Sequence, residues 1–363
     1  NSSQQLAVIL FDKLQLPMIK KRSTAEAVLK ELKQKHPLPE LILNYRKLYK
    51  LKNTYLDPLP SNIVPITDRV HSSFNQTMTA TGRLSTSNPN FQNIPIRTED
   101  GKEIRKAIKA QSNDYQIFSA DYSQVELRVM AHLSGDESLI AALNNGEDIH
   151  TFTAKNIFNV EDDDQVLPEM RRIAKIVNFG IMYGAGPFRL SQELDVPFGE
   201  AKKIKDAYFD KYKGIEQYIE NSKIQIKDSK SVETLLGRKR AVWDSDSQNK
   251  IRRDAAERMA INMPIQGTAA EMIKLAMIKI HRKLKSEKLK SKLIMQIHDE
   301  LLLEVHKDEV DYITEMVIEY MRDAMKLDVP IEIDFGIGPS WYCLLYTSPS
   351  PRDATLSRMP SSA

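Results

Sequence analysis

The chain has few of the residues that mark several protein classes. It contains one cysteine, Cys343, among 363 residues, which excludes an internal disulfide framework and fits a reducing compartment. No run of 18 or more apolar residues occurs, so the sequence predicts no membrane-spanning helix. The His and Cys spacing of zinc sites is missing, as is the GxxxxGK[ST] loop of P-loop enzymes. We therefore expect a cytoplasmic protein that uses neither zinc nor a P-loop.

Excess charge is also scarce. There are 52 Lys and Arg residues against 49 Asp and Glu residues, a net charge of +3, which is too small to indicate nucleic-acid binding by itself. The distribution is more informative, because residues 1–60 hold eleven Lys and Arg against five Asp and Glu. Such a basic segment is most often simply solvated, and a surface that faces DNA is the alternative.

The two ends of the chain differ from its body. Residues 1–14 lack an initiator Met and the basic start of a signal peptide, so we expect the interior of a longer protein. Residues 343–363 are small, polar and rich in Pro and Ser, without periodicity. We interpret them as a non-native tail and exclude them, with Cys343, from the fold.

Hydrophobic patterning divides the body of the chain. Residues 1–60 read as helices that end at the DPLP run, with Leu41, Tyr45, Leu48 and Tyr55 near one face. Residues 71–97 are rich in Ser, Thr and Asn and predict an extended loop or hairpin layer. Helical patterns dominate from about 126 to 290, and short strands around one helix follow up to about 338.

Two carboxylates end predicted strands. Asp121 follows the apolar run Tyr115–Ala120, and Asp299 lies in a His-Asp-Glu turn between the apolar runs 293–297 and 301–305. A helix-capping Asp and a solvated hairpin tip are the ordinary interpretations. If the strands pair, however, acids that are 178 residues apart (299 − 121) meet at one end of a sheet. Two aspartates are what two Mg²⁺ ions, roughly 3.5–4 Å apart, require.

The segment 167–186 predicts a helix that enters at Pro168. At about 100° per residue, one side is apolar: Met170, Ile173, Ala174, Val177 and Ile181. The other side carries Arg171, Lys175, Phe179 and Tyr183 at one-turn intervals. Cations alone would be a solvated face, but two aromatic residues continuing the row are unusual on a surface. Cations for phosphate followed by rings for a base favour a nucleoside triphosphate site.

The polar segment 71–97 has two interpretations. It is either a plain surface loop or a nucleic-acid contact, since Arg83, Asn90, Gln92 and Asn93 are side chains that bind phosphates and minor-groove acceptors.

Three segments together resemble the signature motifs of family A DNA polymerases, the bacterial DNA polymerase I type. They are DYSQVELR at 121–128, the RxxxKxxxFGxxYG pattern from Arg171 to Gly184, and HDE at 298–300. The similarity continues, in family order, through TATGRLSTSNPNFQNIP, GEDIHTFTA, VETLLGRKR and ERMAINMPIQGTAAEMIKLAM. It extends from residue 1 to about 342.

The resemblance implies an α+β fold shaped like a right hand, with an antiparallel palm sheet, helical fingers and a partial helical thumb. By that resemblance the chain divides as follows: 1–65, the C-terminal part of the thumb; 66–135, the first part of the palm; 136–285, the fingers; 286–342, the second part of the palm; 343–363, the tail. The proofreading-type and 5′-nuclease domains usual upstream in the family are not in this chain.

The resemblance also implies roles for individual residues. Asp121, Asp299 and the backbone carbonyl of Tyr122 match the metal ligands, with Glu300 in support. Arg171, Lys175 and His150 match residues that hold the incoming triphosphate, and Lys175 counts with Asp121, Asp299 and Glu300 as catalytic. Phe179 packs on the incoming sugar and base, Tyr183 lies beside the templating base, and Glu126 occupies the space of a ribose 2′-hydroxyl. Arg83, Gln266 and His298 match contacts to primer–template near the primer end, and Asn90, Asn93 and Lys52 match contacts to the duplex backbone.

The implied function is DNA-templated DNA synthesis for replication or repair. Deoxynucleotides from triphosphates are added to a primer 3′-OH on primer–template DNA, with two Mg²⁺ ions, or Mn²⁺ in their place, and release of pyrophosphate. We expect a monomer that binds no membrane and is nucleoid-associated if bacterial. A non-catalytic DNA-binding relative is an alternative, but it predicts loss of Asp121 and Asp299. A two-metal nuclease is another, and it needs more acids near this pair.

Overall fold

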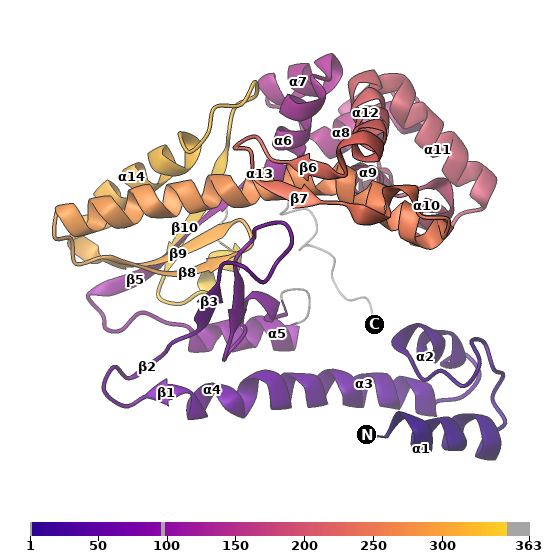
Figure 1. Ribbon diagram of the computed structural model, residues 1–363. Coiled ribbons are helices and arrows are strands. Elements are labelled where there is room, and N and C mark those ends of the chain that lie inside the picture. Colours follow the sequence, from indigo (N-terminus) through magenta and orange to yellow (C-terminus); the bar gives the residue numbers. More distant parts are fainter. Residues whose placement is uncertain (1, 96–98, 347–363) are drawn as a thin grey trace. The chain divides into compact units, whose positions relative to one another are not determined.

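The computed structural model describes residues 2–95 and 99–346 and shows helices combined with antiparallel strands (Figure 1). The described residues form two compact units, one of residues 2–73, 86–95 and 99–104, the other of residues 74–85 and 105–346. The part of the predicted tail at 347–363 lies outside the described residues. None of the helices among the described residues combines the length and apolarity that crossing a bilayer requires.

The first unit is mainly helical. Its elements are α1 Ser3–Ala7, η1 Val8–Lys13, α2 Glu26–Leu32, α3 Leu38–Leu51, η2 Lys52–Leu56, α4 Pro58–Ser61, β1 Ile63–Val64, β2 Arg69–Val70, η3 Phe91–Asn93 and α5 Glu99–Ile104. A small apolar core joins η1 to α2 through Leu10, Phe11, Val28, Leu29 and Leu32. The helical prediction for residues 1–60 is thus confirmed.

The predicted apolar face of the helix in 38–56 is exposed at three of its four residues. Leu41, Tyr45 and Leu48 are exposed by 62%, 53% and 58%, and only Tyr55 is buried. Because α3 packs on the core of this unit through its other side, Ile42 among others becomes partly buried instead. The continuous helix made of α3 and η2 ends at Leu56, directly before the DPLP run at 57–60, as predicted. A separate one-turn helix, α4, then begins at Pro58, because proline is tolerated in a first turn.

The chain passes between the units in two short strands, β3 Ser73–Asn75 and β4 Ser85–Ser87. This agrees with the extended or hairpin layer predicted for residues 71–97, of which residues 96 and 97 lie outside the described residues.

The second unit contains a four-stranded antiparallel sheet. Its strands are β5 Tyr115–Tyr122, β8 Lys292–Ile297, β9 Glu300–His306 and β10 Ile333–Gly338, in the order β10-β5-β9-β8. The register places Asp121 opposite Glu300 of β9 and opposite Asp334 of β10. His298 and Asp299 form the two-residue turn between β8 and β9, with His298 at a φ of 54°. The predicted pairing of these distant strands is confirmed.

Helices make up most of the rest of this unit. They are η4 Arg105–Ala107, α6 Val125–Ser134, α7 Glu137–Asn144, α8 Ile149–Phe158, η5 Asp163–Gln165, α9 Pro168–Met182, α10 Pro187–Leu194, α11 Phe198–Lys211, α12 Lys213–Ser229, η6 Trp243–Asp246, α13 Lys250–Ser286, η7 Lys307–Glu309, α14 Val310–Arg322 and η8 Cys343–Tyr346. One hairpin, β6 Ser231–Glu233 and β7 Lys239–Ala241, interrupts them. α14 packs on β5, β9 and β10, while α13 contacts β8, α6, α12 and β6 (Figure 1).

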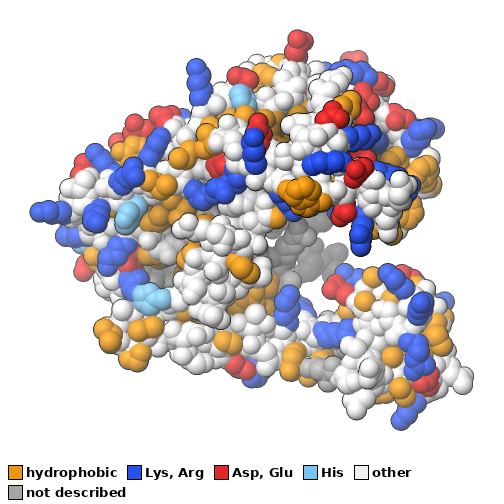
Figure 2. Space-filling model, in the orientation of Figure 1, with side chains coloured by type: hydrophobic (Ala, Val, Ile, Leu, Met, Phe, Trp, Pro, Cys, Tyr) orange, Lys and Arg blue, Asp and Glu red, His pale blue; other side chains and the backbone are white. Residues whose placement is uncertain are grey.

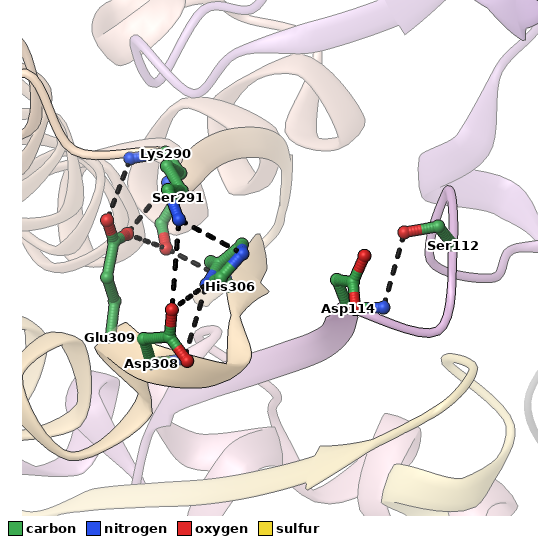
Figure 3. A network of polar contacts seen from close by, with 7 residues as sticks. All are labelled: Ser112, Asp114, Lys290, Ser291, His306, Asp308 and Glu309. Atoms are coloured by element: carbon green, nitrogen blue, oxygen red, sulfur yellow. Dashed lines mark hydrogen bonds and ion pairs between the residues drawn. The ribbon is translucent and has the colours of Figure 1, made fainter.

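A polar network fixes the end of the sheet away from Asp121 (Figure 3). The Glu309 carboxylate accepts hydrogen bonds from the backbone N–H groups of Lys290 and Ser291, both at 2.9 Å, and from Ser291 Oγ at 2.6 Å. Ser291 Oγ also accepts the backbone N–H of His306 at 3.0 Å. The chain after α13 is thereby tied to the end of β9 and the start of α14, which anchors the hairpin that carries Asp299.

Charge is dispersed over the face drawn in Figure 2. On the face drawn in Figure 2, Lys and Arg side chains are interspersed with acidic ones and do not form one patch. This agrees with the small net charge of +3.

Candidate active site

Two aspartates meet at one end of the sheet because β5 and β9 are neighbours. Asp121 is the second-last residue of β5. The next residue, Tyr122, donates its backbone N–H to the backbone carbonyl of Asp299 at 3.2 Å. The Asp121 side chain has solvent access, although protein atoms surround it on most sides. That position penalises its charged form and raises its pKa well above the usual value, and the nearby carboxylates of Glu300, Asp299 and Asp334 act in the same direction.

Asp299 has a similar environment. Burial raises the pKa of its carboxyl group, and the charge of Glu126 adds to that effect, while Arg83 and His298 oppose it. Arg83 Nη2 lies 3.8 Å from Asp299 Oδ1. Within residues 2–95 and 99–346, no three His, Cys, Asp or Glu side chains surround a single point as a complete metal site. The site therefore offers a pair of carboxylates rather than a full set of ligands.

Glu300 is held beside the pair by its own partners. Its Oε1 accepts hydrogen bonds from Ser119 Oγ at 2.5 Å and from Trp341 Nε1 at 3.0 Å. The guanidinium of Arg105 stacks 3.6 Å from the centre of the Trp341 ring. These contacts fix the orientation of the Glu300 carboxylate, which is half-buried like Asp299, and leave Asp121 as the exposed acid of the three.

The predicted two-sided helix is present as α9. Its apolar side buries Ala174, Val177 and Ile181, while Lys175 is exposed. Tyr183 lies one residue beyond the helix, as its C-terminal cap. The prolyl entry at Pro168 is also as predicted.

Cations and rings follow one another along the other side of α9. Arg171 Nη2 binds Asp148 Oδ2 at 2.6 Å. The rings of His150 and Phe179 are 5.7 Å apart, and those of Phe179 and Tyr183 are stacked at 6.2 Å with a tilt of 28°. The structure thus brings together Arg171, Phe179 and Tyr183 with His150 of α8, as the sequence indicated.

His150 is buried and neutral near pH 7. Burial lowers its pKa to about 4, against the attraction of Asp148 and with the repulsion of Lys175 and Arg171. Its Nδ1 faces the amide Nδ2 of Asn178 at 3.1 Å. Because the amide nitrogen is a donor, Nδ1 accepts and the ring hydrogen is carried by Nε2. His150 can therefore donate a hydrogen bond to a phosphate without carrying a charge.

Glu126 is clamped from two sides. Its side chain is 8% exposed, Arg83 Nη2 donates to Oε1 at 2.5 Å, and the Tyr183 hydroxyl donates to Oε2 at 2.6 Å. Burial, and then the charge of Glu126, raise the pKa of Tyr183, which also has a side-chain hydrogen bond with Gln266 of α13. A connected series of hydrogen bonds and ion pairs thus runs from Gln266 through Tyr183, Glu126 and Arg83 towards Asp299.

The other predicted DNA contacts have separate positions. His298 is exposed in the turn after β8. In the first unit, Lys52 binds Asp57 Oδ2 at 2.5 Å, Asn90 Oδ1 accepts from Thr86 Oγ1 at 2.9 Å, and the backbone carbonyl of Asn93 accepts from the Tyr55 hydroxyl.

Two residues that contact the site were missed by sequence reasoning. Asp148 caps α8 by accepting the backbone N–H groups of His150 and Thr151, and it also orients Arg171. Asn178 orients His150 and exchanges hydrogen bonds with Thr153. An Asp before a helix signals only a cap, and one Asn inside a helix follows no apolar period.

Comparison with known proteins identifies the fold. A family model described as DNA polymerase family A matches residues 1–343. DNA polymerase I of Bacillus subtilis (strain 168) is 47% identical over 346 residues, covering 94% of this chain and 39% of the relative. The thermostable DNA polymerase I of Thermus aquaticus is 48% identical over 347 residues, covering 94% and 41%. The chain therefore spans about two fifths of the length of these relatives.

A solved structure agrees with these matches. The POL domain of Pol1 from M. smegmatis, in complex with DNA primer-template and dNTP, has a TM-score of 0.89 and 42% sequence identity, covering 95% of this chain and 62% of that one. The fold of helices around an antiparallel sheet is accordingly that of a polymerase domain. The chain belongs to DNA polymerase family A.

Proposed function

We propose that this chain is the catalytic part of a DNA-templated DNA polymerase that acts in replication or repair. The observation that carries the proposal is the pair Asp121 and Asp299, joined across β5 and β9, in a unit whose helix α9 presents cations and rings in one row. The match over residues 1–343 supports the same activity. A primer 3′-oxygen would attack the α-phosphorus of a deoxynucleoside triphosphate, and the bond to the bridging oxygen would break to release pyrophosphate.

The carboxylate pair fits divalent metal ions. Asp121 and Asp299 have raised pKa values because protein atoms surround them on most sides and nearby carboxylates repel their negative charges, and a cation would remove that penalty. Mg²⁺ commonly takes one or two carboxylates and fills its remaining positions with water and substrate phosphates, so an incomplete ligand set suits it. Asp121, Asp299 and the Tyr122 carbonyl would hold two Mg²⁺ ions, or Mn²⁺ in their place. When bound, these supply positive charge that favours the ionised 3′-oxygen and offsets charge on the leaving group.

The row along α9 would hold the nucleotide. Arg171 and Lys175 supply positive charge for the triphosphate, and His150 adds a neutral donor at Nε2. Phe179 offers a ring face to the sugar and base, and Tyr183 lies next to it for the templating base. Catalysis by Lys175 and its neighbours is then mainly positioning and charge stabilisation.

Glu126 would select the sugar. Its carboxylate is immobilised by Arg83 and Tyr183, so it cannot move aside for a 2′-hydroxyl. Arg83, Gln266 and His298 would contact the primer–template near the primer end, and within the first unit Asn90, Asn93 and Lys52 would contact the duplex backbone.

The proposed function includes an assignment of the chain to the subdomains of a polymerase. We assign 1–65 to the thumb, 66–135 and 286–342 to the palm, and 136–285 to the fingers. A sheet whose strands come from 115–122 and from 292–338 supports a palm made of two separate stretches. We further propose that the protein acts as a monomer where DNA is held, which is the cytoplasm and nucleoid in a bacterium.

Primer extension tests the proposal. The chain is incubated with a 5′-labelled primer annealed to a longer template, four deoxynucleoside triphosphates, and Mg²⁺, Mn²⁺ or a chelator. Extension that needs a divalent ion is expected. Shortened primers would indicate a nuclease, and duplex binding without any change of the primer would indicate a non-catalytic relative. Sedimentation of the free chain and of its complex with duplex DNA tests whether the protein is a monomer.

A further inference from the structure

One face of α13 receives two loops from other parts of the second unit. Gly267, Thr268, Glu271 and Lys274 follow helical spacing and lie on one side of the helix; we name these four residues the loop-docking face. The loop 79–83 and the loop 234–238, which joins β6 to β7, both pack on it. Figure 1 shows β6 and β7 alongside α13.

Lys274 holds the loop 79–83 by its backbone. Its Nζ donates to the carbonyl of Gly82 at 2.9 Å, and Gly82 has a φ of +77°. Gly267 allows the close approach, because a Cβ there would lie 3.3 Å from the carbonyl oxygen of Thr81 and 2.5 Å from Thr234 Cγ2. A side chain at Gly267 would therefore collide with the second loop and crowd the first.

Glu271 holds the second loop against the first. Its Oε1 accepts from Arg238 Nε at 3.2 Å, and the side chain of Arg238 lies over Gly82, where a Cβ would be 3.1 Å from Arg238 Cδ. The Glu271 side chain is only 7% exposed. Among the described residues its Oε2 has no hydrogen-bond partner, so this buried anion depends on the adjacent cations Arg238 and Lys274. Burial, together with the charge of Arg238, lowers the pKa of Lys274, while Glu271 opposes that change.

Arg83 follows Gly82 and is the last residue of the loop 79–83. Its backbone carbonyl accepts the hydroxyl of Thr79 at 2.6 Å, so the loop closes on itself at this position. From there the guanidinium reaches Glu126 Oε1 at 2.5 Å and approaches Asp299 Oδ1 at 3.8 Å. The Arg83 side chain thus starts from a backbone that α13 holds and ends on the residue proposed to select the sugar.

We propose that Lys274 and Glu271 are positioning residues for Arg83 and, through Arg83 and Glu126, determine how strongly deoxynucleotides are preferred over ribonucleotides. The inference rests on the proposed polymerase function. Neither residue needs to touch the nucleotide, because Lys274 acts on the Gly82 carbonyl and Glu271 acts on Arg238.

Lys274→Met tests the inference, since it removes the Nζ donor and keeps the length of the side chain. Lys279→Met is a matched control, because Lys279 lies on the same helix and donates to a different backbone carbonyl, that of Asp323, also at 2.9 Å. The measurement is kcat/KM for a deoxynucleotide divided by kcat/KM for the matching ribonucleotide in single-nucleotide primer extension. The K274M ratio is expected to fall about three- to tenfold, the equivalent of one net hydrogen bond, and the K279M ratio to stay unchanged.

Glu271→Gln, which keeps the shape of the side chain, is expected to lower the ratio in the same direction. A ratio that is equal in the unaltered chain, K274M and E271Q overturns the role in selectivity. General loss of folding does not imitate the expected result, because it lowers the active fraction for both nucleotides alike and leaves their ratio unchanged.

Hydrogen exchange of the full chain separates this inference from the proposed function. Amides of residues 79–83 are expected to exchange faster in K274M than in the unaltered chain or in K279M. Unchanged exchange overturns the positioning role whether or not the chain extends primers. If the unaltered chain extends no primer, the proposed function and the selectivity role fail together, and exchange still decides whether Lys274 positions the loop.

Discussion

The Tyr183 hydroxyl donates to Glu126 Oε2 at 2.6 Å, which links the residue just after α9 to the first turn of α6. The other carboxylate oxygen accepts from Arg83 Nη2 at 2.5 Å. A carboxylate that is bound on both oxygens and is 8% exposed has little freedom to rotate. Rigidity is what a steric gate requires, because a mobile side chain would yield to an additional hydroxyl group.

Replacing Glu126 tests the gate. Glu126→Ala is expected to raise ribonucleotide use relative to deoxynucleotide use by about tenfold or more, since the space beside the sugar opens. Glu126→Gln keeps the volume and is expected to have a smaller effect. Competition between matched ribo- and deoxynucleotides in primer extension measures both. If E126A keeps the ratio of the unaltered chain, Glu126 does not select the sugar.

Asp121→Asn and Asp299→Asn test the metal-binding pair. Each is expected to lower Mg²⁺-dependent primer extension by about 10³-fold or more, equivalent to about 4 kcal/mol of barrier, because an amide binds a divalent cation poorly. Duplex binding, measured by fluorescence anisotropy, is expected to be retained. Asp114→Asn, just before the other end of β5, is the control and should extend primers normally. Near-normal extension by D121N or D299N would contradict the assignment.

Asp148→Asn tests a residue that the sequence did not single out. The change removes the charge that holds Arg171 at 2.6 Å while keeping an oxygen for the helix cap, so Arg171 loses its orientation. We expect KM for the deoxynucleotide to rise about tenfold, as for the loss of one charged hydrogen bond of about 1.5 kcal/mol, with little change in kcat. Glu169→Gln removes the neighbouring exposed pair with Arg172 and should leave KM unchanged. Equal KM values for D148N and E169Q would exclude a role for Asp148 in nucleotide binding.

Much of the carboxylate site could be predicted from the sequence. Apolar runs of strand length flank Asp121 and Asp299, and the two-residue turn that carries Asp299 follows from the break between two such runs. The apolar period of α9 separated the buried Ala174 and Val177 from the row that contains Arg171. These features are local, so a window of a few residues contains the physical information.

The remaining contacts depend on tertiary packing. Arg171 and Asp148 are 23 residues apart, and Arg83 and Glu126 are 43 apart; no period in the sequence reports such pairs. The exposure of the apolar face of α3 has the same origin. Leu41 follows the helical period as well as a core residue does, but its exposure is decided by which side of the helix meets the core of the first unit.

The pH dependence of stability tests the buried, neutral His150. Its pKa is lowered from 6.5 to about 4, so between these values the unfolded chain binds a proton that the folded chain does not. The contribution of His150 to the free energy of unfolding is therefore largest above pH 6.5. It falls by up to about 3 kcal/mol as the pH decreases towards 4. His150→Asn, which keeps an acceptor towards Asn178, is expected to flatten the slope of unfolding free energy in that window. His281→Asn, at an exposed position of α13, should keep the slope of the unaltered chain. Denaturant unfolding at intervals between pH 4 and 7 measures all three, and parallel slopes would show that His150 takes up its proton equally in the folded and unfolded chains.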